Sequence, residues 1–167
     1  MDRRRFVLRT LVAFGGVSAL GRAALAGAQA PNSEKVTKID KVIKTEDEWR
    51  KLLTPAQFNV LRQEGTERPF TSPLNNEKRQ GMFACIACDL PLFESRTKYD
   101  SGTGWPSFYA AIPGRLESKV DHKMILPRDE YHCARCGGHH GHLFDDGPKP
   151  TGMRYCNNGV ALKFVPA

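Results

Sequence analysis

Five cysteines carry most of the chemistry that this sequence can perform. Four of them form two C-x-x-C pairs, Cys85 with Cys88 and Cys133 with Cys136, and the fifth, Cys156, stands alone near the carboxyl end. Two C-x-x-C pairs supply the four ligands of a closed tetrahedral zinc site. Cys156 would then be the only thiol that remains free to react.

The spacing of the paired cysteines favours a metal. A C-x-x-C turn directs both sulfurs to one side, and four thiolates prefer zinc or iron to hard cations. The long gap between the pairs indicates that the chain folds between them, so the ion would join distant strands and its binding would stabilise the fold. Spacing alone leaves open two disulfides, a thioredoxin-like redox pair, or an electron carrier with iron on the same four thiolates.

The surroundings of Cys156 point to a nucleophile. Arg154 is a nearby cation, which is expected to favour the thiolate and lower the thiol pKa. Upstream, the segment 137–148 contains His139, His140 and His142, whose side chains exchange protons near neutral pH. A thiolate and an acid would share one cleft if two strands bring these segments together. The alternative is that Cys156 is a small buried apolar residue.

The amino terminus resembles a twin-arginine export signal over residues 1–28. Arg3, Arg4, Arg5 and Phe6 match the pattern R-R-x-F, and a weakly apolar stretch and small residues follow. The apolar stretch falls short of the roughly 20 residues of a membrane anchor, so no stable membrane insertion is expected. A Sec-type or uncleaved leader is the alternative. We expect cleavage after Ala28.

Removing that leader changes the charge and the redox setting. The formal charge is +7, and residues 1–28 hold five arginines and one aspartate, a contribution of +4, so the mature domain carries about +3. That is too little to indicate nucleic-acid binding. We expect the protein in the periplasm, which is oxidising. Folding before twin-arginine export would allow zinc to load in the cytoplasm.

The rest of the chain reads as one domain over residues 45–167, after a flexible tether over 29–44. Capping boxes predict helices over 45–53 and from 54 to about 64, the second ending at Gly65. Punctuated apolar runs beyond residue 81 predict antiparallel strands, most clearly over 120–126, 141–144 and 159–165. Helical spacing predicts that five side chains belong to the core: Trp49, Leu52, Phe58, Val60 and Leu61.

Several motifs occur together in this chain: S-G-T-G-W-P-S-F at 101–108, G-H-L-F-D-D-G-P at 141–148, R-Y-C-N-N at 154–158, and both C-x-x-C pairs. In this combination they resemble one enzyme family, methionine sulfoxide reductase B, over about residues 49–164. The segments L-T-P at 53–55, G-T-E-R-P-F at 65–70 and S-P-L at 72–74 are similar to its amino-terminal part.

The resemblance implies a mainly β fold. It consists of two antiparallel β-sheets in a tent-like arrangement, with amino-terminal helices and one structural zinc ion per chain on the four paired cysteines. The implied reaction is reduction of the R epimer of methionine sulfoxide in proteins or peptides. Cys156 would be the nucleophile and become a sulfenic acid, His139 and His142 would orient or protonate the sulfoxide oxygen, and Asn158 would help to hold the site.

The resemblance also assigns the substrate contacts. Trp105 would bring an indole face to the substrate methyl group and an N–H for positioning, and Arg154 and Asp146 would tune the charge. Many family members have a resolving cysteine where this chain has Thr103. Recycling of Cys156 should therefore need an external thiol, thioredoxin-like or glutaredoxin-like. A monomer is expected, and the main alternative function is a non-enzymatic zinc-binding interaction module.

Overall fold

The structure is a computed structural model that describes residues 39–122 and 127–167. The export signal expected over residues 1–28 lies outside these ranges. Among the described helices, none combines the length and the apolar character that crossing a bilayer requires.

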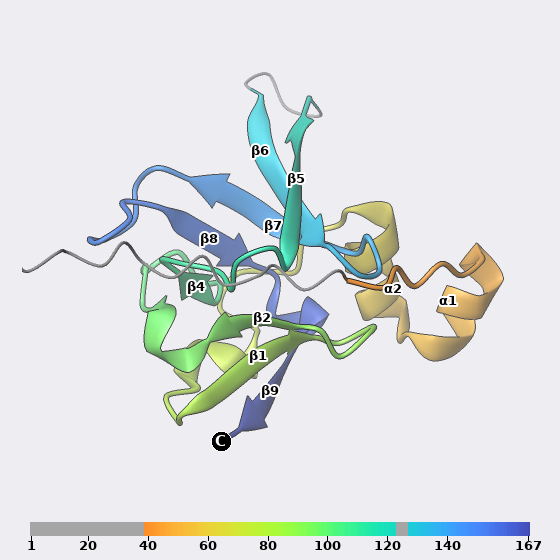
Figure 1. The fold of residues 1–167 in the computed structure, drawn as a ribbon, viewed down its shortest axis with the longest axis horizontal. Helices are drawn as coiled ribbons and strands as arrows, with labels where there is room; N and C mark the ends of the chain where they lie inside the picture. The colour runs from red at the N-terminus through yellow and green to blue at the C-terminus, as the bar shows by residue number, and fades with distance from the viewer. Residues whose placement is uncertain (1–38, 123–126) are drawn as a thin grey trace, which may run out of the picture. The chain divides into compact units, whose positions relative to one another are not determined.

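Two short helices begin the described chain, α1 (Glu46–Leu52) and α2 (Pro55–Gln63). Each begins with the predicted capping box, in which the threonine before the helix and the third helical residue exchange hydrogen bonds, with Thr45 before α1 and Thr54 before α2. Both helices are confirmed. The second helix, α2, packs against the strand β7 (His139–Phe144) and the 3-10 turn η3 (Gly159–Ala161) (Figure 1).

One detail of the helix prediction is wrong. Leu52 is 60% exposed rather than part of the core, because α1 has only two turns and Trp49 alone is buried along it. The helix α2 ends at Gln63, before Gly65 as predicted, and the left-handed residue that caps it is Glu64, with φ of 56°. The other predicted core residues of these helices, Phe58, Val60 and Leu61, are buried.

The end of the expected tether is held against the domain. Val42 donates its backbone N–H to the carbonyl of Arg135 at 2.8 Å, and Ile39 and Val42 pack on the apolar core. Lys41 forms an ion pair with Glu117 on the strand β5 (Leu116–Asp121). The ordered domain therefore includes residues 39–44, which the sequence placed in the tether.

The strands form two antiparallel sheets, as the sequence predicted (Figure 1). The small sheet has the order β2-β1-β9, with β1 at Gly81–Cys85, β2 at Pro91–Glu94 and β9 at Leu162–Pro166. The large sheet has the order β3-β4-β8-β7-β6-β5. Its strands are β3 Lys98–Tyr99, β4 Ser107–Phe108, β5 Leu116–Asp121, β6 Arg128–Cys133, β7 His139–Phe144 and β8 Arg154–Asn157.

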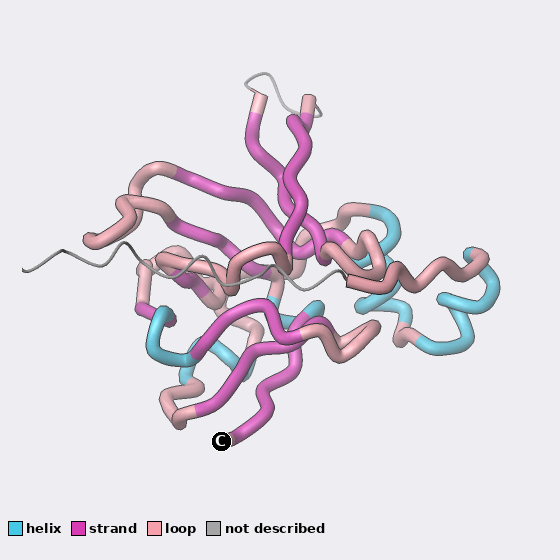
Figure 2. The backbone as a smooth tube through the Cα atoms, in the orientation of Figure 1, coloured by secondary structure: helices cyan, strands magenta, loops and turns pink. Residues whose placement is uncertain are grey.

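The strand predictions hold in part. The range 141–144 lies inside β7, whereas β5 ends at Asp121, and residues 123–126 lie outside the described ranges. The range predicted over 159–165 begins as the 3-10 turn η3 (Gly159–Ala161), and the strand starts only at Leu162. Two further 3-10 turns are η1 (Pro73–Asn76) and η2 (Ser95–Thr97). Figure 2 shows strands and loops making up most of the described chain after α2.

Aromatic side chains pack the two sheets together. Phe93 of the small sheet stacks on Phe108 of β4 with ring centroids 4.3 Å apart, and it meets Tyr155 of β8 edge-on at 5.7 Å. Phe83 meets Phe108 at 5.0 Å. Fully buried rings of this size contribute much of the apolar area that a small domain can bury.

This packing fixes which side chains face away from the core. Successive side chains of a strand point to opposite faces of the sheet. Since Tyr155 packs in the aromatic core and Leu143 packs against it, Cys156 and His142 project from the other face of the large sheet. These two predicted site residues therefore lie on the face that the small sheet does not cover.

Candidate functional site: a four-cysteine cluster and a cysteine pocket

The four paired cysteines converge in one cluster. Cys85 ends β1 and Cys133 ends β6, and each is followed by a turn that carries its partner. The second turn is closed by a hydrogen bond from Gly137 N to the Cys133 carbonyl, with Gly137 in the left-handed region at φ of 66°. The cluster thus joins a strand of the small sheet to a strand of the large sheet.

The sulfur geometry fits a tetrahedral metal ion. All four Sγ atoms lie within 4.8 Å of one another, with Cys85 and Cys136 at 3.7 Å and Cys88 and Cys133 at 3.5 Å. Four Zn–S bonds of about 2.3 Å in a tetrahedron place the sulfurs about 3.8 Å apart. A disulfide needs about 2.0 Å, and all five cysteines are free thiols in the structure. The cluster therefore has the ligand set and spacing of a metal site.

Cys156 occupies the centre of a row of side chains across the large sheet. On β8 it is the register partner of Ser107 on β4 and of His142 on β7. Directly paired residues of antiparallel strands project from the same face, with Cβ atoms about 4.5–5.5 Å apart. The pairing register therefore places the thiol beside the imidazole. The sequence analysis expected this arrangement only if two strands bring the histidine segment and Cys156 together.

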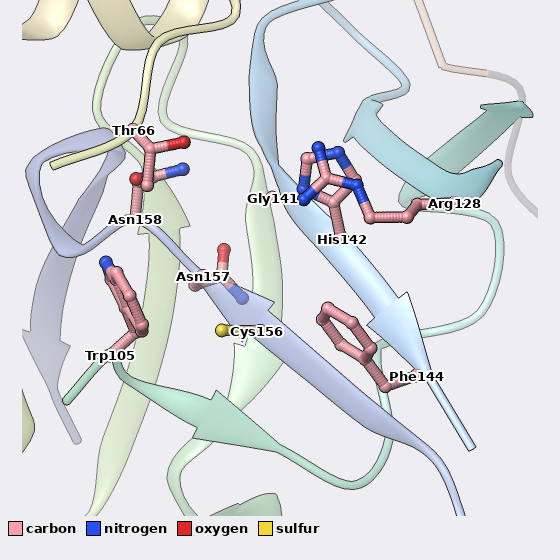
Figure 3. Close-up of a pocket in the computed structure, with 9 residues that line it drawn as sticks. All are labelled: Thr66, Trp105, Arg128, Gly141, His142, Phe144, Cys156, Asn157 and Asn158. Atoms are coloured by element: carbon pink, nitrogen blue, oxygen red, sulfur yellow. The ribbon is translucent and has the colours of Figure 1, made fainter. Parts of the chain in front are cut away.

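A hollow of about 120 Å³ opens at this row. Figure 3 shows Cys156 between Trp105 on one side and His142 and Phe144 on the other. The residues that line the hollow are Thr66, Trp105, Arg128, Gly141, His142, Phe144, Cys156, Asn157 and Asn158. Four of the predicted site residues, Trp105, His142, Cys156 and Asn158, are thus brought together.

Burial has the largest influence on the pKa of Cys156. It raises the pKa of the thiol above its ordinary value, although the Arg154 guanidinium and the Thr103 hydroxyl act in the opposite direction. The sequence led us to expect a lowered pKa from Arg154 alone. That expectation is wrong in sign because the sequence does not reveal how far the sulfur is removed from water.

Arg154 and Asp146 form a fixed pair next to the thiol. Arg154 Nε donates to Asp146 Oδ1 at 2.7 Å and its Nη2 donates to Oδ2 at 2.8 Å. The same guanidinium lies 4.1 Å from the ring centre of Phe144, which lines the pocket. The paired Arg154 holds the pKa of Asp146 below its usual range. Neither residue lines the pocket, but their charges act on the pKa of Cys156 in opposite directions, Arg154 lowering it and Asp146 raising it.

His142 is oriented by a carboxylate that the sequence analysis missed. Its Nε2 lies 2.9 Å from Oδ2 of Asp121, and Arg128 Nη2 donates to the same oxygen at 2.9 Å. Asp121 and Arg128 are register partners at the end of the β5–β6 hairpin. Neither residue belongs to a recognised sequence motif, so only the strand register could have identified Asp121 and Arg128 as part of the site.

His139 does not line the pocket. It is 2% exposed, and its Nδ1 lies 2.9 Å from Oε1 of the equally buried Glu130. Burial lowers the pKa of its ring, against the opposing influence of Glu130. The ring centres of His139 and His142 are 5.4 Å apart. His139 is therefore placed to support His142 rather than to touch a ligand in this pocket.

Trp105 and Asn158 both form hydrogen bonds with the backbone of Glu67. Trp105 Nε1 donates to the Glu67 carbonyl at 3.1 Å, and Glu67 N donates to Asn158 Oδ1 at 2.9 Å. Asn158 also donates Nδ2 to the carbonyl of His140 at 3.0 Å. The indole N–H that was expected to position a substrate is thus already used within the protein.

Thr103 lies beside the thiol, where its hydroxyl lowers the thiol pKa. Its Oγ1 is 2.8 Å from Ser101 Oγ, which is 2.7 Å from Ser107 Oγ. These hydroxyls form a chain along the edge of the site. The residue in the position of the resolving cysteine therefore contacts Cys156 through a hydroxyl, which cannot form a disulfide.

Comparison with known proteins agrees with this geometry. A family model described as the SelR domain matches residues 53–166. The chain is 55% identical over 131 residues to a peptide methionine sulfoxide reductase MsrB of Pseudomonas putida, across 77% of this chain and 97% of that protein.

Two further relatives come from distant organisms. The chain is 54% identical over 124 residues to a peptide methionine sulfoxide reductase MsrB of Methanosarcina barkeri, across 74% of this chain and 87% of that protein. It is 50% identical over 127 residues to one of Agrobacterium fabrum, across 75% of this chain and 94% of that protein. The chain therefore belongs to the peptide methionine sulfoxide reductase B family.

Proposed function

We propose that this protein reduces the R epimer of methionine sulfoxide, within proteins or peptides, to methionine. One observation carries the proposal: a free cysteine, Cys156, opens into a small pocket with an indole on one side and an imidazole on the other. The thiol is a nucleophile, the imidazole is a proton donor, and the indole is an apolar wall. These are the three parts that sulfoxide reduction needs.

The arrangement also accounts for selection of one epimer. A sulfoxide sulfur is pyramidal and carries an oxygen, a methyl group and the rest of the methionine side chain. If the sulfur faces Cys156, the oxygen faces His142 and the methyl group lies on Trp105, only one hand leaves the methionine chain pointing out of the pocket. From the family resemblance we propose that this hand is R.

In the proposed reaction the sulfur of Cys156 attacks the sulfoxide sulfur while His142 protonates the oxygen, because an unprotonated oxide is a poor leaving group. Because burial keeps the pKa of Cys156 raised, the thiol first gives its proton to His142, and His142 then delivers that proton to the sulfoxide oxygen. The oxygen passes to Cys156, which becomes a sulfenic acid, and methionine is released. Asp121 holds the imidazole ring, and Asn158 and Asn157 complete the wall.

Recycling is proposed to use an external thiol. Two equivalents of thiol reduce the sulfenic acid, giving water, a disulfide of the reductant and the free Cys156. Thr103 supplies no sulfur, and the other four cysteines lie together in the cluster. We infer that one structural zinc ion occupies that cluster, which would keep those thiols from taking part.

The setting of the reaction is proposed from the leader. Residues 1–28 would direct the folded protein to the periplasm by the twin-arginine route. There the protein would act as a monomer on oxidised proteins, served by a thioredoxin-like or glutaredoxin-like donor.

A stereospecific assay tests the function. A peptide with each separated sulfoxide epimer is incubated with the native protein and with Cys156→Ser in dithiothreitol, and the product is followed by chromatography. We expect turnover of the R epimer by the native protein only, with the fold and metal content of the variant unchanged. Equal turnover of the S epimer would contradict the proposed stereospecificity. A native protein whose Cys156 is inert toward both epimers would support a zinc-binding interaction module instead.

A further inference from the structure

Glu67 lies in the loop between α2 and η1 and holds the structure around the pocket. Its neighbour Thr66 lines the pocket, while its own side chain points to the start of η3. Oε2 accepts the backbone N–H of Val160 at 3.0 Å, and Oε1 accepts that of Gly159. A carboxylate that accepts two main-chain N–H groups forms charge-assisted bonds, which are stronger than neutral ones.

The backbone of Glu67 makes the other half of the connection. Its N–H donates to the side chain of Asn158 at 2.9 Å, and its carbonyl accepts from the indole of Trp105 at 3.1 Å. Asn158 directly precedes the two residues that the carboxylate binds. The one residue therefore links the loop after α2, the loop that carries Trp105, and the segment that follows Cys156.

The close fit at Gly159 shows how tightly these segments are joined. A Cβ atom at Gly159 would lie 1.9 Å from Ser72 Oγ and 3.3 Å from Glu67 Oε1. No side chain can occupy that space without moving the loop. The hydrogen bonds of the Glu67 carboxylate thus hold Gly159 against Ser72, a contact that is possible only because glycine has no side chain.

We propose that Glu67 is a positioning residue of the site, which fixes the indole of Trp105 and the amide of Asn158 against the pocket. The inference rests on the proposed function and adds a residue to it. The hydrogen bonds that the described part of the chain gives to Glu67 go to Asn158, Trp105 and the start of η3, and not to the thiol or to His142. Its loss should therefore weaken substrate binding and orientation, and it should leave the reactivity of Cys156 intact.

The indole N–H provides a readout that does not depend on activity. The described residues hold two tryptophans, Trp105 and Trp49 on α1, so a spectrum of protein with ¹⁵N-labelled tryptophan assigns one indole signal to each. In Glu67→Ala we expect the Trp105 signal to shift and its hydrogen exchange to quicken. The Trp49 signal should stay in place and serve as the internal reference.

The kinetic experiment uses the full chain with its metal. For Glu67→Ala we expect a rise in KM for the R sulfoxide peptide of about tenfold, a smaller fall in kcat, and a rate of Cys156 alkylation within about twofold of native. Glu67→Gln keeps one acceptor oxygen at nearly the same volume and should be intermediate. Glu46→Gln removes an exposed carboxylate of α1 and should behave as native.

The outcomes separate this inference from the proposed function. An unshifted Trp105 indole signal together with an unchanged KM in Glu67→Ala would overturn the role of Glu67. Shifts of both indole signals with loss of metal would indicate a general structural role, which also counts against it. A native protein that reduces neither epimer would refute the proposed function, while the indole signals would still decide whether Glu67 anchors Trp105.

Discussion

Oδ2 of Asp121 lies 2.9 Å from Nε2 of His142, and the same oxygen accepts a hydrogen bond from Arg128. Asp121 is 6% exposed and ends β5, while His142 lies two strands away on β7. The carboxylate therefore reaches across the end of β6 to fix one nitrogen of the ring. An imidazole has two nitrogens, so in the proposed reaction Nδ1 is the one that would face the sulfoxide oxygen.

The first prediction concerns this pair. Asp121→Asn should lower kcat by about tenfold or more, because an amide can hold the ring in a different orientation and tautomer. Steady-state kinetics on the R sulfoxide peptide measure it. Asp129→Asn changes an exposed carboxylate on the neighbouring strand and is the matched control. Equal kcat values for the two variants would show that Asp121 does not position His142.

The second prediction follows from the buried thiol. Because burial raises the pKa of Cys156, the thiolate fraction is small at neutral pH. The rate of alkylation by iodoacetamide should therefore keep rising with pH beyond about 8.5, the pKa of an ordinary thiol. A plateau of the rate below that pH would contradict the raised pKa.

Two neighbouring charges should move the midpoint of the pH profile of Cys156 alkylation in opposite directions. Arg154 lowers the pKa of Cys156 and Asp146 raises it. Arg154→Met should shift the alkylation profile to higher pH, and Asp146→Asn should shift it to lower pH. Each shift should change the rate at pH 8 by about three- to tenfold. Shifts in the same direction would mean that the two residues act by packing and not by charge.

The features predicted correctly from the sequence were those that depend only on residues close together in the chain. The capping boxes at Thr45 and Thr54 need only neighbouring residues, and the C-x-x-C turns need only their own loops. Asp121 and Glu67 act through strand register and through backbone atoms of distant segments. Neither strand register nor a hydrogen bond to a distant backbone atom can be recognised from the pattern of residue types.

Burial explains the remaining differences. The sequence showed Arg154 beside Cys156 but not the depth of the sulfur, so the direction of the pKa shift was wrong. It showed an indole in a motif but not that Glu67 already accepts its N–H. Leu52 had helical spacing, yet α1 is too short to bury it. In each case the environment of the side chain depends on tertiary packing, which the sequence pattern does not show.

The third prediction concerns the metal cluster. The native protein should hold one zinc ion per chain, and Cys133→Ser should lose it together with much of the stability, because the ion joins β1 to β6. Elemental analysis and thermal unfolding measure both. Cys156→Ser removes a thiol outside the cluster and should keep its zinc. Disulfides among the four paired cysteines, with no metal in the native protein, would contradict this assignment.

The fourth prediction concerns export. Replacing Arg3 and Arg4 together with lysine keeps the charge but should leave the precursor in the cytoplasm if the twin-arginine pathway reads it. Cell fractionation with an antibody to the mature domain measures it. Unchanged export would favour the Sec route, in which the thiols would cross the membrane unfolded and before zinc could bind.

The last prediction follows from Thr103, whose hydroxyl acts on the Cys156 thiol. One equivalent of the R sulfoxide, given without reductant, should leave a sulfenic acid on Cys156 that a dimedone-type probe traps, with no intramolecular disulfide. Thr103→Cys should form a disulfide with Cys156 if the Cβ atoms come within about 3.5 to 4.5 Å. That variant should then be recycled faster by a thioredoxin-like donor.

Thr103→Ser is the matched control for this experiment. It keeps a hydroxyl beside the sulfur, so it should trap with the probe as the native protein does and form no disulfide. Mass spectrometry after digestion identifies each species. A disulfide from Cys156 to a cysteine of the metal cluster in the native protein would show that a cluster thiol resolves the sulfenic acid. The division into four structural cysteines and one reactive cysteine would then be wrong.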